Sequence, residues 1–260
     1  MAESMSPSSP TSKFPEDVRI VALSLKGSAR ISSLRLELAK HGLFDNTEIV
    51  ENERDEFDGL RGCFTSHQNA CAAFLSDPSL KVLIVFEDDV VFKARGSLNL
   101  VQSINMVADA IRTSVAEQIA IGGVPVSPYR KTEVCNIYKT IFQMTHAYGI
   151  SRAGAQKVTG LTFCRHFRLL RIGDHIDHCM SSSLDQAILY PTVAFQRAAN
   201  DVTSAHSLSH IYFFLTRLRD LVGQKNVQIC LEYLFRFMGM LCICSRHERR
   251  GLNSRHPGNT

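Results

Sequence analysis

The sequence lacks the patterns that identify several large classes of protein. Its N-terminus is polar and no apolar run precedes Val18, which excludes a signal peptide. No charge-free stretch has the length of a membrane-spanning helix. The eight cysteines show no paired zinc-binding spacing, and Cys242 and Cys244 form an isolated C-x-C. We therefore expect a soluble protein with free, mostly buried thiols in a reducing compartment, the cytoplasm.

The sequence also has little net charge. A formal net charge of +4, with basic residues scattered until the C-terminus, gives no indication of a nucleic-acid partner. The turn expected at 26–29 has no G-x-G-x-x-G spacing, so we predict no dinucleotide site there. Apolar residues make up 45% and charged residues 21% of the 260 residues, which is typical of a chain that forms a core.

Three regions differ in composition. Residues 1–17 are rich in Ser and Pro and predict a disordered leader. Residues 18–207 carry the alternating apolar segments of a globular domain. Residues 208–260 contain two apolar helical stretches followed by arginines. This C-terminal helical segment fits a layer packed on the domain, while peripheral contact with a membrane interface is the alternative.

The rest of the chain is organised around residues 81–92, which read KVLIVFEDDVVF. The unbroken apolar run predicts a strand buried on both faces in a parallel sheet, where ligands bind at the carboxyl ends of the strands. Glu87, Asp88 and Asp89 stand at that end. In extended chain Glu87 and Asp89 point the same way, and two such charges repel unless a cation or proton lies between them. A hard divalent ion is one interpretation, and a solvated acidic turn is the other.

Other segments complete an α/β pattern, in which strands and helices alternate. We predict strands at 18–25, 47–50, 82–86, 119–123, 141–150, 187–190 and 193–195, and helices at 30–41, from about 62–67 to 75, at 97–115, and from Ser151 onward. The fold class predicted is a Rossmann-like, mostly parallel sheet flanked by helices, with a C-terminal helical segment.

Several motifs occur in the order found in glycosyltransferase family 25. The blocks are GCFTSH, VLIVFEDDVVF, THAYGISRAGAQKV, DHIDH and YPTVAFQ, and the resemblance as a whole covers about 18–204. The chain resembles these enzymes of the lipopolysaccharide-biosynthesis type, which are related to the collagen β-galactosyltransferases. It departs from the family at Ser24, where an asparagine is usual, and in its apolar tail, whereas Arg30 matches a family arginine.

The resemblance implies a GT-A-like fold and an inverting, metal-dependent hexosyltransferase. Such an enzyme moves galactose or glucose from a UDP-sugar to a saccharide or hydroxylated acceptor. It also implies a divalent metal, Mn2+, whose charge offsets that of the leaving diphosphate. Glu87 and Asp89 are the expected metal ligands, and Asp88 is expected to help organise the nucleotide.

The resemblance also assigns the remaining site residues. Arg30, Ser66 and His67 are expected to hold the donor, Asp177 to act as the catalytic base, and His146 to line the site. Asp174 and Asp185 are reserve candidates for the base.

Each of these residues also has an ordinary structural interpretation. Ser66 and His67, taken as the start of a helix, fit either phosphate binding or simple N-capping. His146 fits a buried, hydrogen-bonded histidine, and Tyr148 fits a core aromatic. At the level of the whole protein, the alternative to an enzyme is a transferase-like fold without catalysis that serves as a binding or scaffold subunit.

Overall fold

The structure is a computed structural model that describes residues 14–94, 98–163 and 176–197. The chain divides into two compact units, of which the first holds residues 1–124 and 129–197 and the second holds 125–128 and 198–260. Most of the expected leader, Asp174 and the whole 208–260 segment lie outside the described residues. The predicted domain boundaries and the membrane contact of the tail therefore stay predictions.

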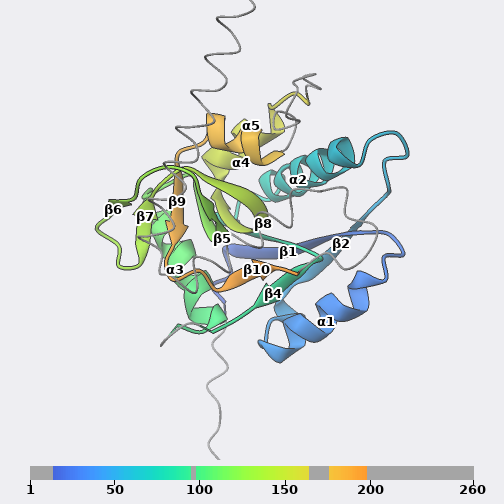
Figure 1. The fold of residues 1–260 in the computed structure, drawn as a ribbon, viewed down its shortest axis with the longest axis horizontal. Coiled ribbons are helices and arrows are strands. Elements are labelled where there is room, and N and C mark those ends of the chain that lie inside the picture. Colours follow the sequence, from blue (N-terminus) through green and yellow to red (C-terminus); the bar gives the residue numbers. More distant parts are fainter. Residues whose placement is uncertain (1–13, 95–97, 164–175, 198–260) are drawn as a thin grey trace, which may run out of the picture. The chain divides into compact units, whose positions relative to one another are not determined.

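A mixed sheet forms the centre of the first unit (Figure 1). Within the described residues its eight strands lie in the order β2-β1-β3-β8-β5-β9-β7-β6. Their bounds are β1 Val18–Leu25, β2 Glu48–Asn52, β3 Val82–Glu87, β5 Gln118–Pro125, β6 Arg130–Lys131, β7 Ile137–Lys139, β8 Phe142–Ser151 and β9 Gln186–Leu189. A separate antiparallel pair consists of β4 (Val90–Phe92) and β10 (Ala194–Gln196).

The strand directions confirm the α/β class and correct one detail of it. β1 pairs in parallel with β2 and β3, and β5 pairs in parallel with β9. However, β8 runs antiparallel to β3, so the central strand has a parallel neighbour on one side only.

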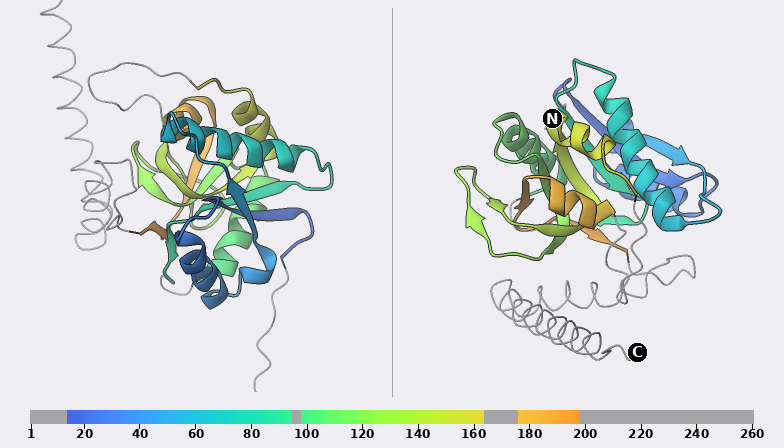
Figure 2. Two further views of the ribbon diagram at one scale, coloured as in Figure 1. Left: turned by 90° about the vertical axis from the view of Figure 1, so that its right-hand side faces the viewer. Right: turned by 90° about the horizontal axis from the view of Figure 1, so that it is seen from above.

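Helices cover both faces of the sheet, which agrees with the predicted GT-A-like arrangement. On one face lie α1 (Arg30–Lys40) and α3 (Leu100–Arg112), and on the other lie α2 (Gly59–Leu75), α4 (Arg152–Thr159) and α5 (Ile176–Ser183) (Figures 1 and 2). A short 3-10 helix, η1, spans Phe44–Asn46. In the described part of the chain, no helix has the length and apolar character that crossing a membrane requires.

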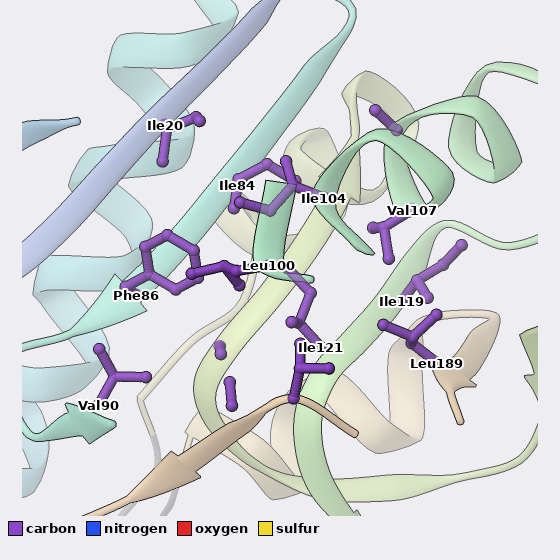
Figure 3. Packing of buried hydrophobic residues seen from close by; sticks show 14 of the residues in the cluster. Ile20, Ile84, Phe86, Val90, Leu100, Ile104, Val107, Ile119, Ile121 and Leu189 are labelled. Atoms are coloured by element: carbon purple, nitrogen blue, oxygen red, sulfur yellow. The ribbon is translucent and has the colours of Figure 1, made fainter. Parts of the chain in front are cut away.

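Strand β3 is apolar without a break because both of its faces are covered. Ile84 and Phe86 pack in the cluster that includes α3 residues such as Ile104 (Figure 3). Leu83 and Val85 pack on the opposite face in the cluster that includes α2. Full burial of one such side chain stabilises the fold by about 1.5–3 kcal/mol. The packing therefore fixes the place where β3 ends and the acidic residues begin.

Local sequence signals set several helix ends as predicted. Gly42, with φ of 69°, follows the end of α1 in the left-handed region that favours glycine. The Ser151 hydroxyl accepts a hydrogen bond of 3.1 Å from the Gly154 amide and caps α4. Asn99 and Gln102 form a capping box that starts α3 inside the range expected for it.

Two local predictions are wrong. Helix α2 begins at Gly59, because the Asp58 carboxylate accepts a hydrogen bond of 3.0 Å from the Leu60 amide and caps the helix there. Ser66 and His67 consequently lie well inside the helix and do not start it. In addition, the segment expected to be a loop between 124 and 135 contains β6, and β7 follows it.

Candidate functional site

The acidic residues lie where β3 ends and the chain turns toward β4. Glu87 is the last residue of β3, whereas Asp88 and Asp89 form a turn before Val90. The extended-chain argument that paired Glu87 with Asp89 is therefore wrong. The three carboxylates instead belong to two hydrogen-bond networks that lie next to each other.

Asp88 is held by the end of β1, the turn after it and the start of α1. Its Oδ2 accepts hydrogen bonds from Ser24 Oγ at 2.7 Å and from Ser28 Oγ at 3.3 Å. Its Oδ1 accepts one from Arg30 Nη1 at 3.3 Å. Ser24, which departs from the family pattern, is thus a direct partner of the acidic motif. The structure brings the predicted Arg30 and Asp88 together.

Asp89 is only partly satisfied by its neighbours. Its Oδ2 accepts a hydrogen bond of 2.9 Å from Gln196 Nε2 and lies 3.6 Å from Arg30 Nη1. Its Oδ1 is buried and has no hydrogen-bond partner among the described residues. Burial and the negative charge of Glu87 raise the pKa of Asp89 to about 7. The Gln196 hydrogen bond and the positive charge of Arg30 lower this pKa, but by less.

Glu87 belongs to a second network that reaches into α2. His67 Nε2 lies 3.3 Å from Glu87 Oε1, and His67 Nδ1 lies 2.9 Å from the Tyr148 hydroxyl. The Thr145 hydroxyl lies 3.0 Å from the same carboxylate oxygen of Glu87. Burial acts to raise the pKa of Glu87, but the hydrogen bond and charge of His67, the charge of His146 and the Thr145 hydrogen bond lower it to about 2. Glu87 is therefore ionised in the folded protein.

Asp177 joins this second network from the first turn of α5. Its Oδ1 accepts a hydrogen bond of 2.7 Å from Thr145, and its Oδ2 accepts one of 3.0 Å from the Met144 amide. Met144 has φ of 77°, a left-handed conformation that residues other than glycine rarely adopt. The distortion of β8 at Met144 thus accompanies the positioning of Asp177.

His146 and Ser66 each contact a backbone carbonyl, and their roles in the site stay predictions. His146 is buried on β8, with Nε2 3.4 Å from the Ala194 carbonyl oxygen, and its charge acts on Glu87. The Ser66 hydroxyl donates to the Gly62 carbonyl of its own helix at 2.8 Å. Because Ser66 and His67 are not at the start of α2, phosphate binding by free amides at these positions is wrong, while a donor contact through their side chains stays a prediction.

Of the two reserve candidates for the base, Asp185 does not join the site. Asp185 forms an ion pair with Lys139, and its amide bonds to Glu117. Asp185 precedes β9, next to the start of β5. The Glu117 carbonyl, just before β5, accepts a hydrogen bond from the Ser151 amide at the end of β8, and Ser151 pairs with Val82 at the start of β3. Asp185 therefore lies near the start of β3, whereas Glu87 lies at the other end of that strand. Asp174 is outside the described residues.

Sequence reasoning missed four polar contacts of the site: Ser24, Ser28, Thr145 and Gln196. The two serines stand in or beside the small-residue turn after β1, which was a usable signal. Thr145 and Gln196 occur inside the motif blocks, but only the tertiary fold shows that they contact carboxylates.

The donor atoms of the first network suit a hard divalent ion. Asp88 and Asp89 offer carboxylate oxygens, the ligands that Mg2+ and Mn2+ prefer. The buried Oδ1 of Asp89, which has no partner within 14–94, 98–163 and 176–197, is the kind of atom that such an ion satisfies. The residues present therefore fit the divalent metal that the resemblance implies, and the roles of Glu87 and Asp89 as its ligands stay a prediction.

Comparisons with known proteins find similar solved structures but no similar sequence family. No family model matches the chain, and no curated protein matches it. The chain is similar to A197 from STIV, at 14% identity and a TM-score of 0.42, over 69% of this chain and 84% of that one. It is similar to a glycosyltransferase involved in glycosylation of the major capsid of PBCV-1, at 11% identity and a TM-score of 0.36, over 61% and 72%.

A third solved structure is UDP-glucose pyrophosphorylase complexed with UDP-glucose. The identity is 6% and the TM-score 0.40, over 75% of this chain and 81% of the other. The resemblance to glycosyltransferase family 25 consequently rests on the sequence motifs alone.

Proposed function

We propose that the protein is a divalent-metal-dependent glycosyltransferase. It transfers a hexose, galactose or glucose, from a UDP-sugar to a hydroxyl of a saccharide or other acceptor, with inversion at the sugar carbon. The observation that carries the proposal is the environment of Asp89 at the carboxyl end of the central strand, beside Asp88. Its carboxylate is buried, and one of its oxygens has no hydrogen-bond partner in the part of the chain that the structure describes. The order of the motif blocks, which resembles family 25, supports the same activity.

Arg30, the first residue of α1, supplies the contact for the donor diphosphate. Arg30 is partly exposed and its guanidinium lies against both Asp88 and Asp89. A guanidinium can bind phosphate oxygens in pairs, so Arg30 can exchange its carboxylate partners for the diphosphate. Asp88 and Asp89 would hold the metal. A bound Mn2+ would supply the Lewis acid that offsets the charge developing on the leaving diphosphate.

Asp177 is the proposed base that removes the proton from the acceptor hydroxyl. Each of its oxygens accepts one hydrogen bond, from Thr145 or from the Met144 amide. Each carboxylate oxygen keeps a further lone pair for the acceptor proton. The Met144 amide on one oxygen and the Thr145 hydroxyl beside the other also limit the rotation of the carboxylate, which favours a productive geometry for proton transfer.

A binding or scaffold protein without catalysis is the second candidate. It is favoured by the ion pairs of Arg30 with Asp88 and Asp89, because the arginine already neutralises part of the acidic motif without a metal. Ser24, at the position where the family usually has asparagine, also contacts Asp88. In this case the acidic residues would stabilise the turn.

The deciding experiment is release of UDP from UDP-galactose and UDP-glucose, measured with and without Mn2+. We expect Mn2+-dependent turnover that Asp89→Ala abolishes. Asp109→Ala is the matched control, because Asp109 is an exposed aspartate on α3 that pairs with Arg112. A folded protein that releases no UDP from either donor with Mn2+ present would support the scaffold role.

A further inference from the structure

We propose that Cys63, His67 and Glu87 form a binding site for a transition-metal ion of the Zn2+ class. One donor atom from each residue, a thiol sulfur, an imidazole nitrogen and a carboxylate oxygen, lies within 4.8 Å of the others. The site is separate from the oxygen-donor pair Asp88 and Asp89, and it does not depend on the proposed transferase activity.

The fold brings these three side chains together in a simple way. Cys63 and His67 are four residues apart on α2, so they project from the same face of the helix one turn apart. That face of α2 packs against the sheet in the cluster that contains Leu83 and Val85 of β3. Glu87 lies further along the same strand, two residues after Val85, and its carboxylate reaches His67. The C-x-x-x-H spacing of Cys63 and His67 on a helix is therefore the sequence pattern that would have pointed to this cluster.

The distance between His67 and Glu87 suits two ligands of one ion. His67 Nε2 lies 3.3 Å from Glu87 Oε1. Two bonds of about 2.0–2.1 Å at a tetrahedral angle place a nitrogen and an oxygen ligand about 3.3 Å apart. An ion can thus replace the proton between these two atoms without a large movement of either side chain. The half-buried Cys63 is a free thiol, available as the third ligand.

Two hydrogen bonds between neighbouring residues and the proposed ligands resemble those that orient the ligands of known metal sites. His67 Nδ1 lies 2.9 Å from the Tyr148 hydroxyl, so a proton on Nδ1 can be donated to Tyr148 while Nε2 is left as a ligand. The Thr145 hydroxyl orients the carboxylate of Glu87. These two contacts, from residues that are not ligands, are independent of the clustering itself.

The donor types determine which ions fit. A thiolate and an imidazole favour Zn2+ and related borderline ions, whereas Mg2+ and Mn2+ prefer oxygen ligands only. Three protein ligands also leave a fourth tetrahedral position open. Because Glu87 belongs to the cluster, an ion bound here would take Glu87 out of its hydrogen bond with His67.

Cobalt titration of the metal-free protein tests the site without an activity assay. We expect one equivalent of Co2+ to bind with a thiolate-to-cobalt charge-transfer band, and Cys63→Ser to abolish the band. Cys71→Ser is the matched control, since Cys71 is a buried free thiol on the same helix and outside the cluster. Absence of the band in the wild type, or its persistence in Cys63→Ser, would overturn the proposal.

Two further measurements test the site even if Cys63→Ser fails to fold. In the wild type, Zn2+ but not Mn2+ should protect Cys63 from maleimide, read by peptide mass spectrometry, while the exposed Cys135 reacts equally in both. Tyr148→Phe, which removes only the outer contact, should weaken Zn2+ binding about 10–100-fold. Equal labelling of Cys63 with and without Zn2+ would contradict the site.

Discussion

The hydroxyl of Thr145 lies 2.7 Å from Oδ1 of Asp177. The same hydroxyl lies 3.0 Å from Oε1 of Glu87. Because a threonine hydroxyl has a single hydrogen, it can donate to only one of these carboxylates at a time. Thr145 therefore links the proposed base on α5 to the end of the central strand.

Replacement of Thr145 by valine should impair catalysis more than donor binding. Thr145→Val removes the hydroxyl at almost constant volume and leaves two adjacent carboxylates without their shared donor. We expect kcat to fall about tenfold or more with little change in KM for the donor, and stability to fall by about 1–3 kcal/mol. Thr145→Ser keeps the hydroxyl and should retain most of the activity. A valine variant with the wild-type kcat would show that Thr145 does not position Asp177.

Gly122 on β5 should tolerate no side chain. A Cβ there would lie 2.2 Å from the Ala194 carbonyl oxygen and 2.6 Å from His146 Nε2. Gly122→Ala should therefore lower the free energy of unfolding by about 2 kcal/mol or more, measured by urea denaturation. Gly160→Ala is the control, because its nearest contact would be 3.5 Å and its φ is −85°. Equal stability of both variants would contradict this packing.

The ion pair of Asp17 with Arg112 should give a stability difference that depends on pH. Arg112 donates to both oxygens of Asp17, at 2.9 and 2.6 Å. The Arg112 hydrogen bond holds the pKa of Asp17 below its ordinary value of 3.8. The stabilisation is thus present above the unfolded-state pKa and is lost as the pH falls through the lower folded-state pKa.

For Asp17→Asn we accordingly expect a loss of about 1 kcal/mol at pH 7, which shrinks as the pH falls below about 4. Urea denaturation at a series of pH values measures the difference. Asp45→Asn changes an exposed aspartate in η1 and serves as the control for the loss of one surface charge. A difference for Asp17→Asn that stays constant with pH would contradict the role of this ion pair.

The fold was predictable where one local signal sufficed. Strand β3 is apolar up to Glu87 and β1 is mostly apolar, because both faces of the sheet are covered, so their bounds agree closely with prediction. The helix expected from Ser151 onward is present, because Ser151 is of a residue type that caps helix N-termini. In contrast, β6 and β7 are only two and three residues long and carry no periodicity that sequence analysis can detect.

The candidate site was predictable in part. Arg30 lies against Asp88 and Asp89 as expected. Thr145 links Asp177 to Glu87, while the roles of these residues stay predictions. The pairing of carboxylates was not predictable, because the chain turns at Asp88 and leaves the extended conformation on which the argument depended. Thr145 and Gln196 contact carboxylates 58 and 107 residues away, and such contacts depend on the whole sheet.

The most direct test of the proposed function separates donor binding from turnover. Binding of UDP-galactose and UDP-glucose is measured by calorimetry, with and without Mn2+, for the wild type, Asp89→Asn and Asp177→Asn. We predict Mn2+-dependent binding to the wild type, its loss in Asp89→Asn, and normal binding without turnover in Asp177→Asn. Binding that ignores Mn2+ and survives Asp89→Asn, or full turnover by Asp177→Asn, would contradict the proposed roles of these two carboxylates.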